Sequence, residues 1–143
     1  MTKSEDILRL MLGAHALTRM AALDTPSPAP AAQWRTLSLL RDHGPQRLGE
    51  LARLSRISQP GMTRLAGQMA DAGLLTREAD PHDSRVSVLS ATDAGIAALD
   101  QWLVQLQASL APRFADLTDD DWAALRRAAR ILTDKTGARE ETR

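Results

Sequence analysis

The chain has 143 residues, of which 43% are hydrophobic and 25% charged, and its 18 basic side chains balance 18 acidic ones. This length fits one domain with a substantial core, and the composition is too apolar for a disordered chain. The absence of cysteine excludes disulfide scaffolds and zinc–thiolate sites. No apolar run approaches the roughly 20 residues of a membrane span, and the first residues lack a secretory signal, so we expect a cytoplasmic protein without membrane contact.

Two helices separated by a loop are predicted at the start of the chain. Apolar residues at spacings of three and four predict an opening helix over residues 4–23, with Ser4 as its N-cap. The Pro-rich segment 24–30 is predicted as a loop. A second helix begins near Ala31 and ends at Gly44. Its inward side chains are Trp34, Leu37 and Leu40.

Two short helices with a tight turn between them are predicted next. The first begins near Leu48; the second begins after Ser58 as N-cap and ends at Gly73. Only residues 55–57 connect them. A small residue is needed where two such helices cross, and Ala52 takes that place. The side chains expected to be buried around the crossing are Leu51, Ile57, Met62 and Leu65.

After the second short helix the pattern changes to that of a β-hairpin. Residues 74–78 and 86–89 alternate or carry β-branched side chains, and residues 80–83 between them have turn chemistry. This is the only strand signal that the pattern gives.

Two further helices complete the predicted elements. Thr92 caps a long helix whose apolar residues repeat as in a helix–helix seam, and Pro112 ends or kinks it. Thr118 opens the last helix with a near capping box, and residues 136–143 are expected to fray. The predicted fold class is therefore mainly α with a small β-hairpin wing.

This order of elements is that of a winged helix-turn-helix within a single domain, residues 1–143. Residues 31–91 form its predicted DNA-binding part, and residues 4–23 and 92–135 are predicted as dimerisation helices. Gln suits adenine, the Thr methyl suits thymine, and Arg suits guanine or phosphate. The residues expected to contact double-stranded DNA are Ser58, Gln59, Pro60, Thr63, Arg64, Gln68, Asp83 and Arg85.

The charged tip of the hairpin supports this interpretation. Arg85 is placed to enter a minor groove, and Asp83 two residues earlier can hold its guanidinium. Of the 18 basic residues, 16 are Arg, which suits phosphate recognition but equally fits a compositional bias of the source. The alternative for Arg64 and Arg85 is ordinary solvent-exposed charge.

A homodimer is expected because one winged helix reads too few base pairs for useful specificity. A two-fold dimer places two recognition helices about 34 Å apart on half-sites one helical turn apart. The residues expected at the dimer contact are Ile7, Leu10, Met11, Leu103, Leu106, Leu110, Trp122 and Leu125. The competing interpretation of these faces is an intramolecular core.

The sequence resembles the MarR family of bacterial transcriptional regulators over roughly residues 5–135. The run from Gln59 to Leu65 looks like the start of the family's recognition helix, and Asp83-Ser84-Arg85 followed by a Thr-x-x-Gly at residues 92–95 is similar to its wing signature. Three residues depart from the family's pattern: Ala91, where the family often has Leu before the Thr; Arg56, in a turn where many helix-turn-helix proteins have Gly; and Gly61 within the recognition helix. A helical Gly costs about 1 kcal/mol relative to Ala.

The resemblance implies a homodimer that usually represses from an inverted-repeat, pseudo-palindromic operator. Many members release DNA when a small aromatic acid or drug-like molecule binds, which is a shift between two conformational states. The residues predicted to line such a pocket are His15, Arg19, Trp34 and Arg41. The alternative is a core Trp and solvent-facing His and Arg. No cofactor is expected, and the three His residues lack the spacing of a metal site.

Two other classes of protein are alternatives to a DNA-binding regulator. An enzyme is disfavoured because the chain has no Gly-rich phosphate loop, no G-x-S-x-G elbow and no H-E-x-x-H motif. A winged-helix ligand-binding or protein-interaction module without specific DNA binding is expected to lack cations on the helix and wing. Arg64 and Arg85 argue against that module, although the zero net charge keeps it open.

Overall fold

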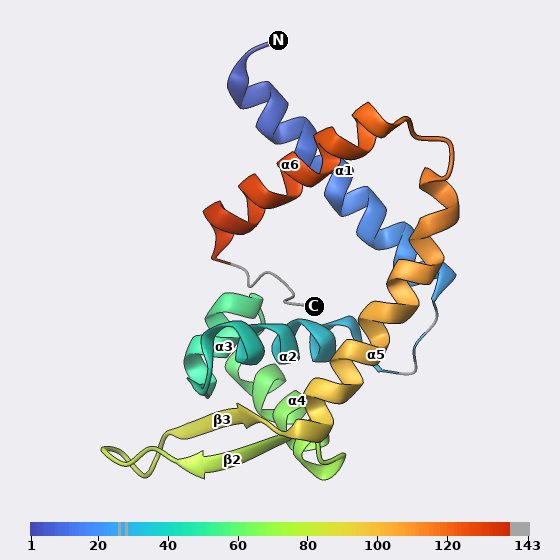
Figure 1. Cartoon of the computed structure of the whole chain (residues 1–143). Coiled ribbons are helices and arrows are strands. Elements are labelled where there is room, and N and C mark those ends of the chain that lie inside the picture. The colour runs from blue at the N-terminus through green and yellow to red at the C-terminus, as the bar shows by residue number, and fades with distance from the viewer. Residues whose placement is uncertain (26, 28, 138–143) are drawn as a thin grey trace. The chain divides into compact units, whose positions relative to one another are not determined.

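The chain divides into two compact units in the computed structural model, which describes residues 1–25, 27 and 29–137 (Figure 1). The first unit contains Met1–Pro28 and Trp102–Asp116, and the second contains Ala29–Gln101 and Leu117–Arg143. Helix α5 (Asp93–Leu110) contributes to both units, and the β-sheet belongs to the second.

Helix α1 (Lys3–Asp24) of the first unit begins with a capping box. The Thr2 hydroxyl accepts a hydrogen bond from the Glu5 amide at 3.2 Å, and the Glu5 carboxylate accepts one from the Thr2 amide at 2.6 Å. The prediction that Ser4 is the N-cap is therefore wrong. Thr2 has an acidic residue at the third helical position to reciprocate the bond, and Ser4 lies within the helix.

The far end of α1 is tied to a 3-10 helix, η1 (Ala111–Phe114). The Asp24 carboxylate accepts a hydrogen bond from the Arg113 guanidinium at 2.6 Å. Pro112 lies in the first turn of η1, and α5 ends just before it at Leu110. Of the two outcomes predicted for this proline, an end or a kink of the long helix, the structure shows the end.

Helices α2 (Ala31–His43), α3 (Leu48–Ser55) and α4 (Gln59–Asp71) of the second unit lie close to their predicted positions. Leu51 and Ala52 of α3 are 0% and 3% exposed, so the predicted burial of Leu51 is confirmed and Ala52 also lies in the core. Trp34 and Ile57, expected inside, are half-buried. The buried apolar side chains of these three helices are Leu37, Leu40, Leu51, Ala52, Met62, Leu65, Ala66 and Met69.

The turn between α3 and α4 is made by a residue with a positive φ. Arg56 has φ +55° and ψ +42°, the left-handed region, and its amide donates to carbonyl groups at the end of α3. This conformation costs an L-residue about 1–2 kcal/mol, which explains why glycine is common there in helix-turn-helix proteins.

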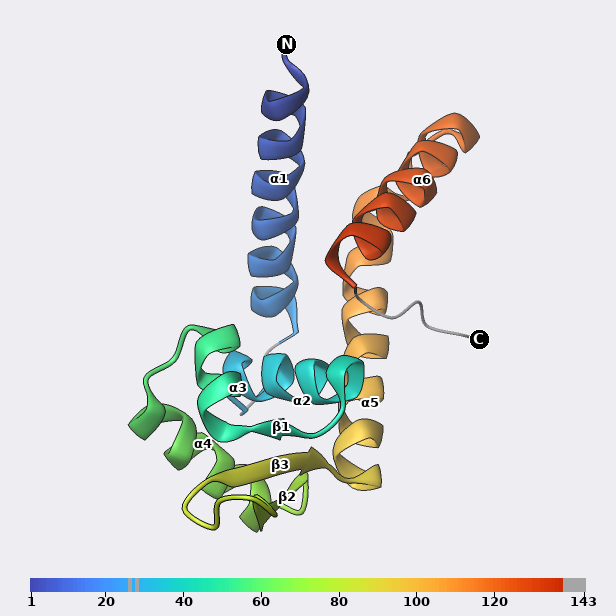
Figure 2. The ribbon, with the colours of Figure 1, turned by 90° about the vertical axis from the view of Figure 1, so that its left-hand side faces the viewer.

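The sheet has three antiparallel strands in the order β1-β3-β2, formed by β1 (Gln46–Arg47), β2 (Leu75–Ala79) and β3 (Ser87–Ala91) (Figure 2). The predicted hairpin is confirmed as β2 and β3. The prediction that the hairpin holds the only strand is wrong, because β1 pairs with Val88 and Leu89 of β3. A two-residue strand is too short to show the alternation by which strands are recognised.

A hydrogen-bonded junction joins the end of α4 to the start of α5. The Thr92 hydroxyl donates to the Gly73 carbonyl oxygen at 2.6 Å and accepts from the Gly95 amide at 3.0 Å, which confirms Thr92 as the cap of α5. The Thr92 amide donates to the Leu74 carbonyl oxygen at 3.1 Å. A Cβ on Gly95 would lie 2.0 Å from that same oxygen, so only glycine fits here. Thr92 and Gly95 of the Thr-x-x-Gly signature therefore fix the start of α5 against residues 73–74, which follow α4.

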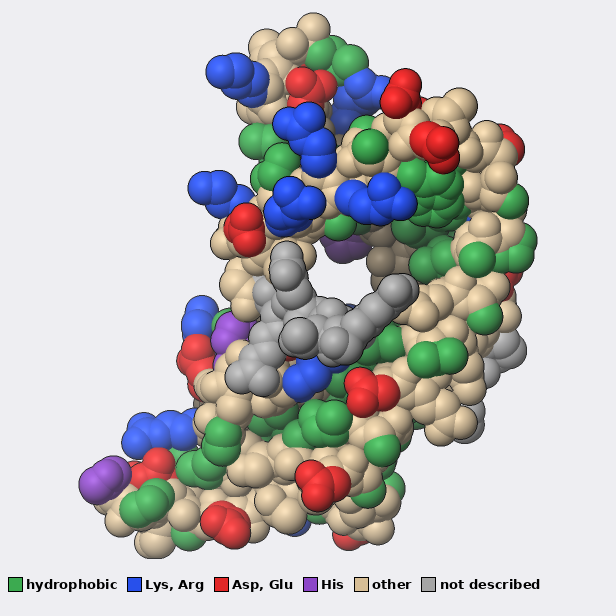
Figure 3. Space-filling model, viewed as in Figure 1, with side chains coloured by type: hydrophobic (Ala, Val, Ile, Leu, Met, Phe, Trp, Pro, Cys, Tyr) green, Lys and Arg blue, Asp and Glu red, His purple; other side chains and the backbone are tan. Residues whose placement is uncertain are grey.

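Helix α6 (Asp119–Thr136) has the predicted capping box, with the Thr118 hydroxyl accepting from the Asp121 amide at 3.2 Å. None of its 18 residues is buried. Apolar and basic side chains both lie on its visible surface (Figure 3). The tail predicted to fray comprises residues 136–143. Thr136 is still the last residue of α6, and Gly137 caps this helix. Residues 138–143 lie outside the described part of the chain.

Candidate nucleic-acid interface

The N-terminus of α4 is held by Ser58. Its hydroxyl accepts a hydrogen bond from the Gly61 amide at 3.1 Å, and Pro60 lies in the first turn, as predicted. A Cβ on Gly61 would lie 2.9 Å from Ile57 Cγ2 and 3.0 Å from Ser58 Oγ. The glycine within the helix therefore allows the cap and Ile57 to approach closely, which offsets its intrinsic cost.

The outer face of α4 is polar and open to solvent. Its inner face is buried, since Met62, Ala66 and Met69 are each 0% exposed. The predicted DNA contacts of α4 are all exposed and share the outer face: Gln59, Pro60, Thr63, Arg64 and Gln68. A helix with such a face presents side chains that can read base edges in a major groove.

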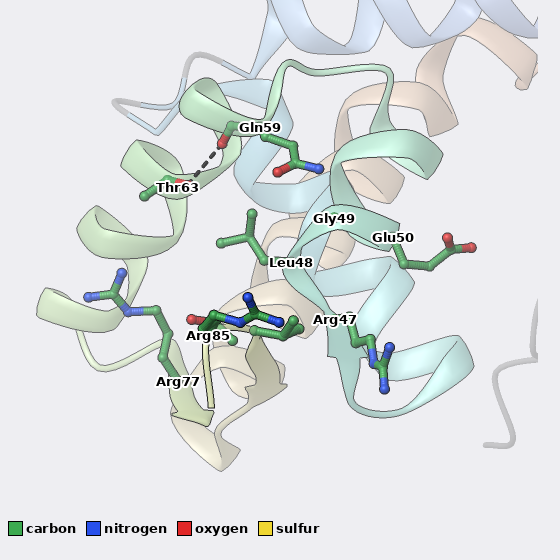
Figure 4. A pocket seen from close by; sticks show the side chains of 10 residues that line it. Arg47, Leu48, Gly49, Glu50, Gln59, Thr63, Arg77 and Arg85 are labelled. Carbon is green, nitrogen blue, oxygen red and sulfur yellow. Dashed lines mark hydrogen bonds between the residues drawn. The ribbon is translucent and has the colours of Figure 1, made fainter. Parts of the chain in front are cut away.

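Two of these side chains have defined local contacts. The Thr63 hydroxyl donates to the Gln59 carbonyl oxygen at 2.9 Å, so its hydrogen is used within the helix (Figure 4). The Gln59 amide lies over Gly49 of α3, where a Cβ would come within 3.3 Å of Gln59 Nε2. Gly49 therefore leaves space for the Gln59 side chain between α3 and α4.

We define the wing as residues 75–91. Its tip carries the predicted pair of Asp83 and Arg85. The Asp83 carboxylate accepts hydrogen bonds from the Arg85 guanidinium at 3.1 and 3.2 Å, and from the Arg85 amide at 3.1 Å. These bonds hold the pKa of Asp83 below its usual range. The Arg85 side chain is 89% exposed, so this pair aims a cation outward from the wing.

Asp80, which the sequence analysis did not single out, anchors the base of the same loop. Its carboxylate is almost buried, and it accepts from the amides of His82 at 2.8 Å and Asp83 at 3.3 Å and from the Arg47 guanidinium at 3.0 Å. The backbone bond from His82 is the main reason why the pKa of Asp80 is lowered. Asp80 therefore links the wing to β1 and fixes the residue that holds Arg85.

A groove of about 490 Å³ lies between α4 and the wing. It is lined by Gln59 and Thr63 of α4, Gly49 of α3, Arg77 of β2 and Arg85 of the wing loop (Figure 4). The structure thus brings three of the predicted residues, Gln59, Thr63 and Arg85, to one concave surface. The other predicted contacts do not line it: Ser58, Pro60, Arg64, Gln68 and Asp83. Arg77 was missed, because only strand register shows where its side chain points.

Comparison with known proteins identifies this architecture. The MarR family model matches residues 30–87. An HTH-type transcriptional regulator of Mycobacterium leprae is 30% identical over 131 residues, covering 86% of this chain and 87% of the relative. The chain belongs to the MarR family.

Solved structures agree with this assignment at the level of the fold. The crystal structure of Rv1404 from Mycobacterium tuberculosis superposes with a TM-score of 0.76 at 22% identity, covering 99% of each chain. BpsR of Bordetella bronchiseptica superposes with a TM-score of 0.59 at 23% identity, covering 94% of this chain and 97% of BpsR. In the described part of this MarR-family chain, no helix combines the length and hydropathy needed to cross a bilayer.

The residues predicted to line an effector pocket lie in different units of the MarR-family chain. His15 and Arg19 are exposed on α1 of the first unit. In the second unit Trp34 is half-buried on α2, and Arg41 pairs with Asp42 at 3.1 Å. A shared pocket stays a prediction. No cluster of three metal-ligating side chains occurs among the described residues.

The predicted dimer residues differ in exposure. Those of α1 and α6 are open: Ile7 is 69% exposed, Met11 49% and Leu125 41%. Those of α5 are half-buried: Leu103, Leu106 and Leu110. The remaining two, Leu10 and Trp122, are 41% and 37% exposed.

Proposed function

We propose that this MarR-family protein is a sequence-specific double-stranded DNA-binding repressor that acts as a homodimer on an inverted-repeat operator. The observation that carries the proposal is the concave surface on which the exposed α4 face lies beside Arg85, held outward by Asp83. Arg64 and Arg85 are both exposed. A protein that had lost DNA binding has no need of a cation aimed outward by a dedicated carboxylate.

The homodimer is supported by two helices that bury almost none of their side chains within the described part of the chain. Helix α1 buries only Ala21 of its 22 residues, and α6 buries none of its 18. Helices of this kind depend on tertiary packing of an apolar face for most of their stability. A second copy of the chain is the partner that would cover these faces and pair two recognition helices on a two-fold operator.

We further propose that a small aromatic effector releases the operator. The DNA binding of BpsR is described as regulated by 6-hydroxynicotinic acid, and this chain shares the fold of BpsR. The candidate residues for recognising such an acid are His15, Arg19, Trp34 and Arg41, which combine cations with an aromatic face. An effector acts by favouring a dimer whose recognition helices no longer match the groove spacing.

A fluorescence-anisotropy titration tests DNA binding directly. The purified protein is titrated against a duplex from the region upstream of its own coding sequence, with a scrambled duplex as control, at 50 and 200 mM salt. We expect salt-sensitive binding that prefers the upstream duplex by about a thousandfold. Weak binding that is equal for the two duplexes, for this and other candidate operators, contradicts sequence-specific regulation.

Substitution of Leu125 by glutamate tests the dimer. A charge on the apolar face of α6 is expected to shift the protein to monomers at micromolar concentration and to weaken operator binding, because one winged helix contacts a single half-site. Analytical ultracentrifugation measures the first effect and anisotropy the second. Ala123→Glu, which adds the same charge on the opposite side of α6, is the matched control and is expected to stay dimeric. A fully dimeric Leu125→Glu protein contradicts the assignment of this face.

A further inference from the structure

The groove between α4 and the wing is lined by three arginines, Arg47, Arg77 and Arg85. Among the described residues that line it, Glu50 is the acidic one. Its carboxylate already accepts two hydrogen bonds from Arg53, at 2.6 and 3.1 Å. Thus the groove carries an excess of positive charge, contributed by the arginines that line it.

Arg77 reaches this groove because of its register in β2. It pairs with Leu89 of β3, and residues paired across antiparallel strands lie on the same face of a sheet. Leu75 and Leu89 on that face are 2% and 0% exposed, whereas Arg77 is exposed. The stem of Arg77 therefore starts on the helix-facing side of the sheet, and its guanidinium extends along α4 (Figure 4).

Arg77 also differs from the other two groove arginines in its charge partners. Arg47 is paired with Asp80 and Arg85 with Asp83. Within the described part of the chain, Arg77 makes no ion pair. Among the groove arginines it is the one whose charge no carboxylate of the described residues pairs with, so an anionic ligand gains the most from contact with it.

We propose that the groove binds the sugar–phosphate backbone of one operator strand and that the Arg77 guanidinium binds one of the phosphate groups of that backbone. This inference rests on the proposed function. Adjacent major and minor grooves of a DNA duplex are separated by the sugar–phosphate backbone of one strand. A protein with a helix in the major groove and a hairpin in the minor groove must therefore have that backbone between the helix and the hairpin. The groove lies between α4 and the wing, at the place where that strand passes. A contact of this kind fixes register and adds affinity without reading sequence.

The test is the salt dependence of DNA binding by Arg77→Ala. We expect binding to weaken about tenfold at 50 mM salt, to the same extent for operator and scrambled duplex, because a phosphate contact is blind to sequence. The plot of log affinity against log salt concentration has a negative slope, and loss of one phosphate contact makes this slope shallower by about 0.9. Between 50 and 200 mM salt the wild type therefore loses about 3.5-fold more affinity than the variant does.

Two control variants separate this role from others. Arg77→Lys keeps the charge and is expected to retain most of the salt dependence of the wild type. Arg9→Ala removes an exposed arginine of α1, outside the winged helix, and is expected to change neither the affinity for DNA nor its salt dependence. Thermal unfolding followed by circular dichroism checks that Arg77→Ala is folded; Arg77→Gln provides a second neutral variant.

The outcomes are distinct. If Arg77→Ala binds DNA with the affinity and the salt dependence of the wild type, the proposal that Arg77 binds a phosphate group is wrong, whereas the proposed function is unaffected. A variant that loses its preference for the operator over scrambled DNA also overturns it, because Arg77 then reads bases. Absence of salt-sensitive binding by the wild type overturns both proposals.

Discussion

Replacing Gly95 by alanine is expected to lower the free energy of unfolding by about 3 kcal/mol or more, the upper part of the range for overpacked sites. The added Cβ would lie 2.0 Å from the Leu74 carbonyl oxygen and 3.1 Å from Leu37 Cδ2. That oxygen cannot retreat freely, because it accepts the Thr92 amide at 3.1 Å. Helix α5 must therefore move away, which strains the Thr92 bonds to Gly73 and Gly95 at the back of the wing.

Urea denaturation followed by circular dichroism measures this loss. Gly67→Ala is the matched control: it makes the same chemical change within helix α4, where a new Cβ meets nothing within 4 Å. Alanine is the better helix former by about 1 kcal/mol, so Gly67→Ala is expected to leave stability unchanged or raise it. A Gly95→Ala protein that unfolds at the wild-type midpoint contradicts the packing of this junction.

The elements predicted well from sequence are those whose signals are local. The caps at Ser58, Thr92 and Thr118 and the proline that ends α5 act within a few residues, so their patterns in the sequence were sufficient. The N-cap of α1 failed because two hydroxyl residues compete there, and the reciprocal bond from Glu5 selects Thr2.

The parts that the sequence did not reveal depend on contacts between distant residues. Arg47 and Asp80 are 33 positions apart and meet because β1 lies beside β3. The aim of Arg77 follows from its pairing with Leu89, which a pattern of alternating residues alone does not specify. Gly61 was recognised by its cost, but the close approach of Ile57 that requires it is visible only in three dimensions.

Replacing Arg85 by alanine is expected to weaken operator binding by at least about tenfold, because a guanidinium in a narrow minor groove meets enhanced negative potential. The side chain is 89% exposed and its hydrogen bonds within the protein go to Asp83, so its loss is not expected to alter folding or the oligomeric state. Anisotropy with the operator duplex measures affinity, and ultracentrifugation checks the dimer. Arg9→Ala on α1 serves as the charge-matched control. Unchanged operator affinity in Arg85→Ala contradicts the wing contact.

Asp83→Asn shows whether the carboxylate acts by positioning Arg85. The amide keeps the size of the side chain but loses the charge and one of the acceptors that hold the guanidinium. Operator binding is therefore expected to weaken by about threefold to tenfold when Arg85 is present, and to change little in the Arg85→Ala background. A loss of equal size in both backgrounds means that Asp83 supports the wing without directing Arg85. A selective loss shows that the ion pair orients Arg85 before DNA is bound, so that less side-chain freedom is lost on binding.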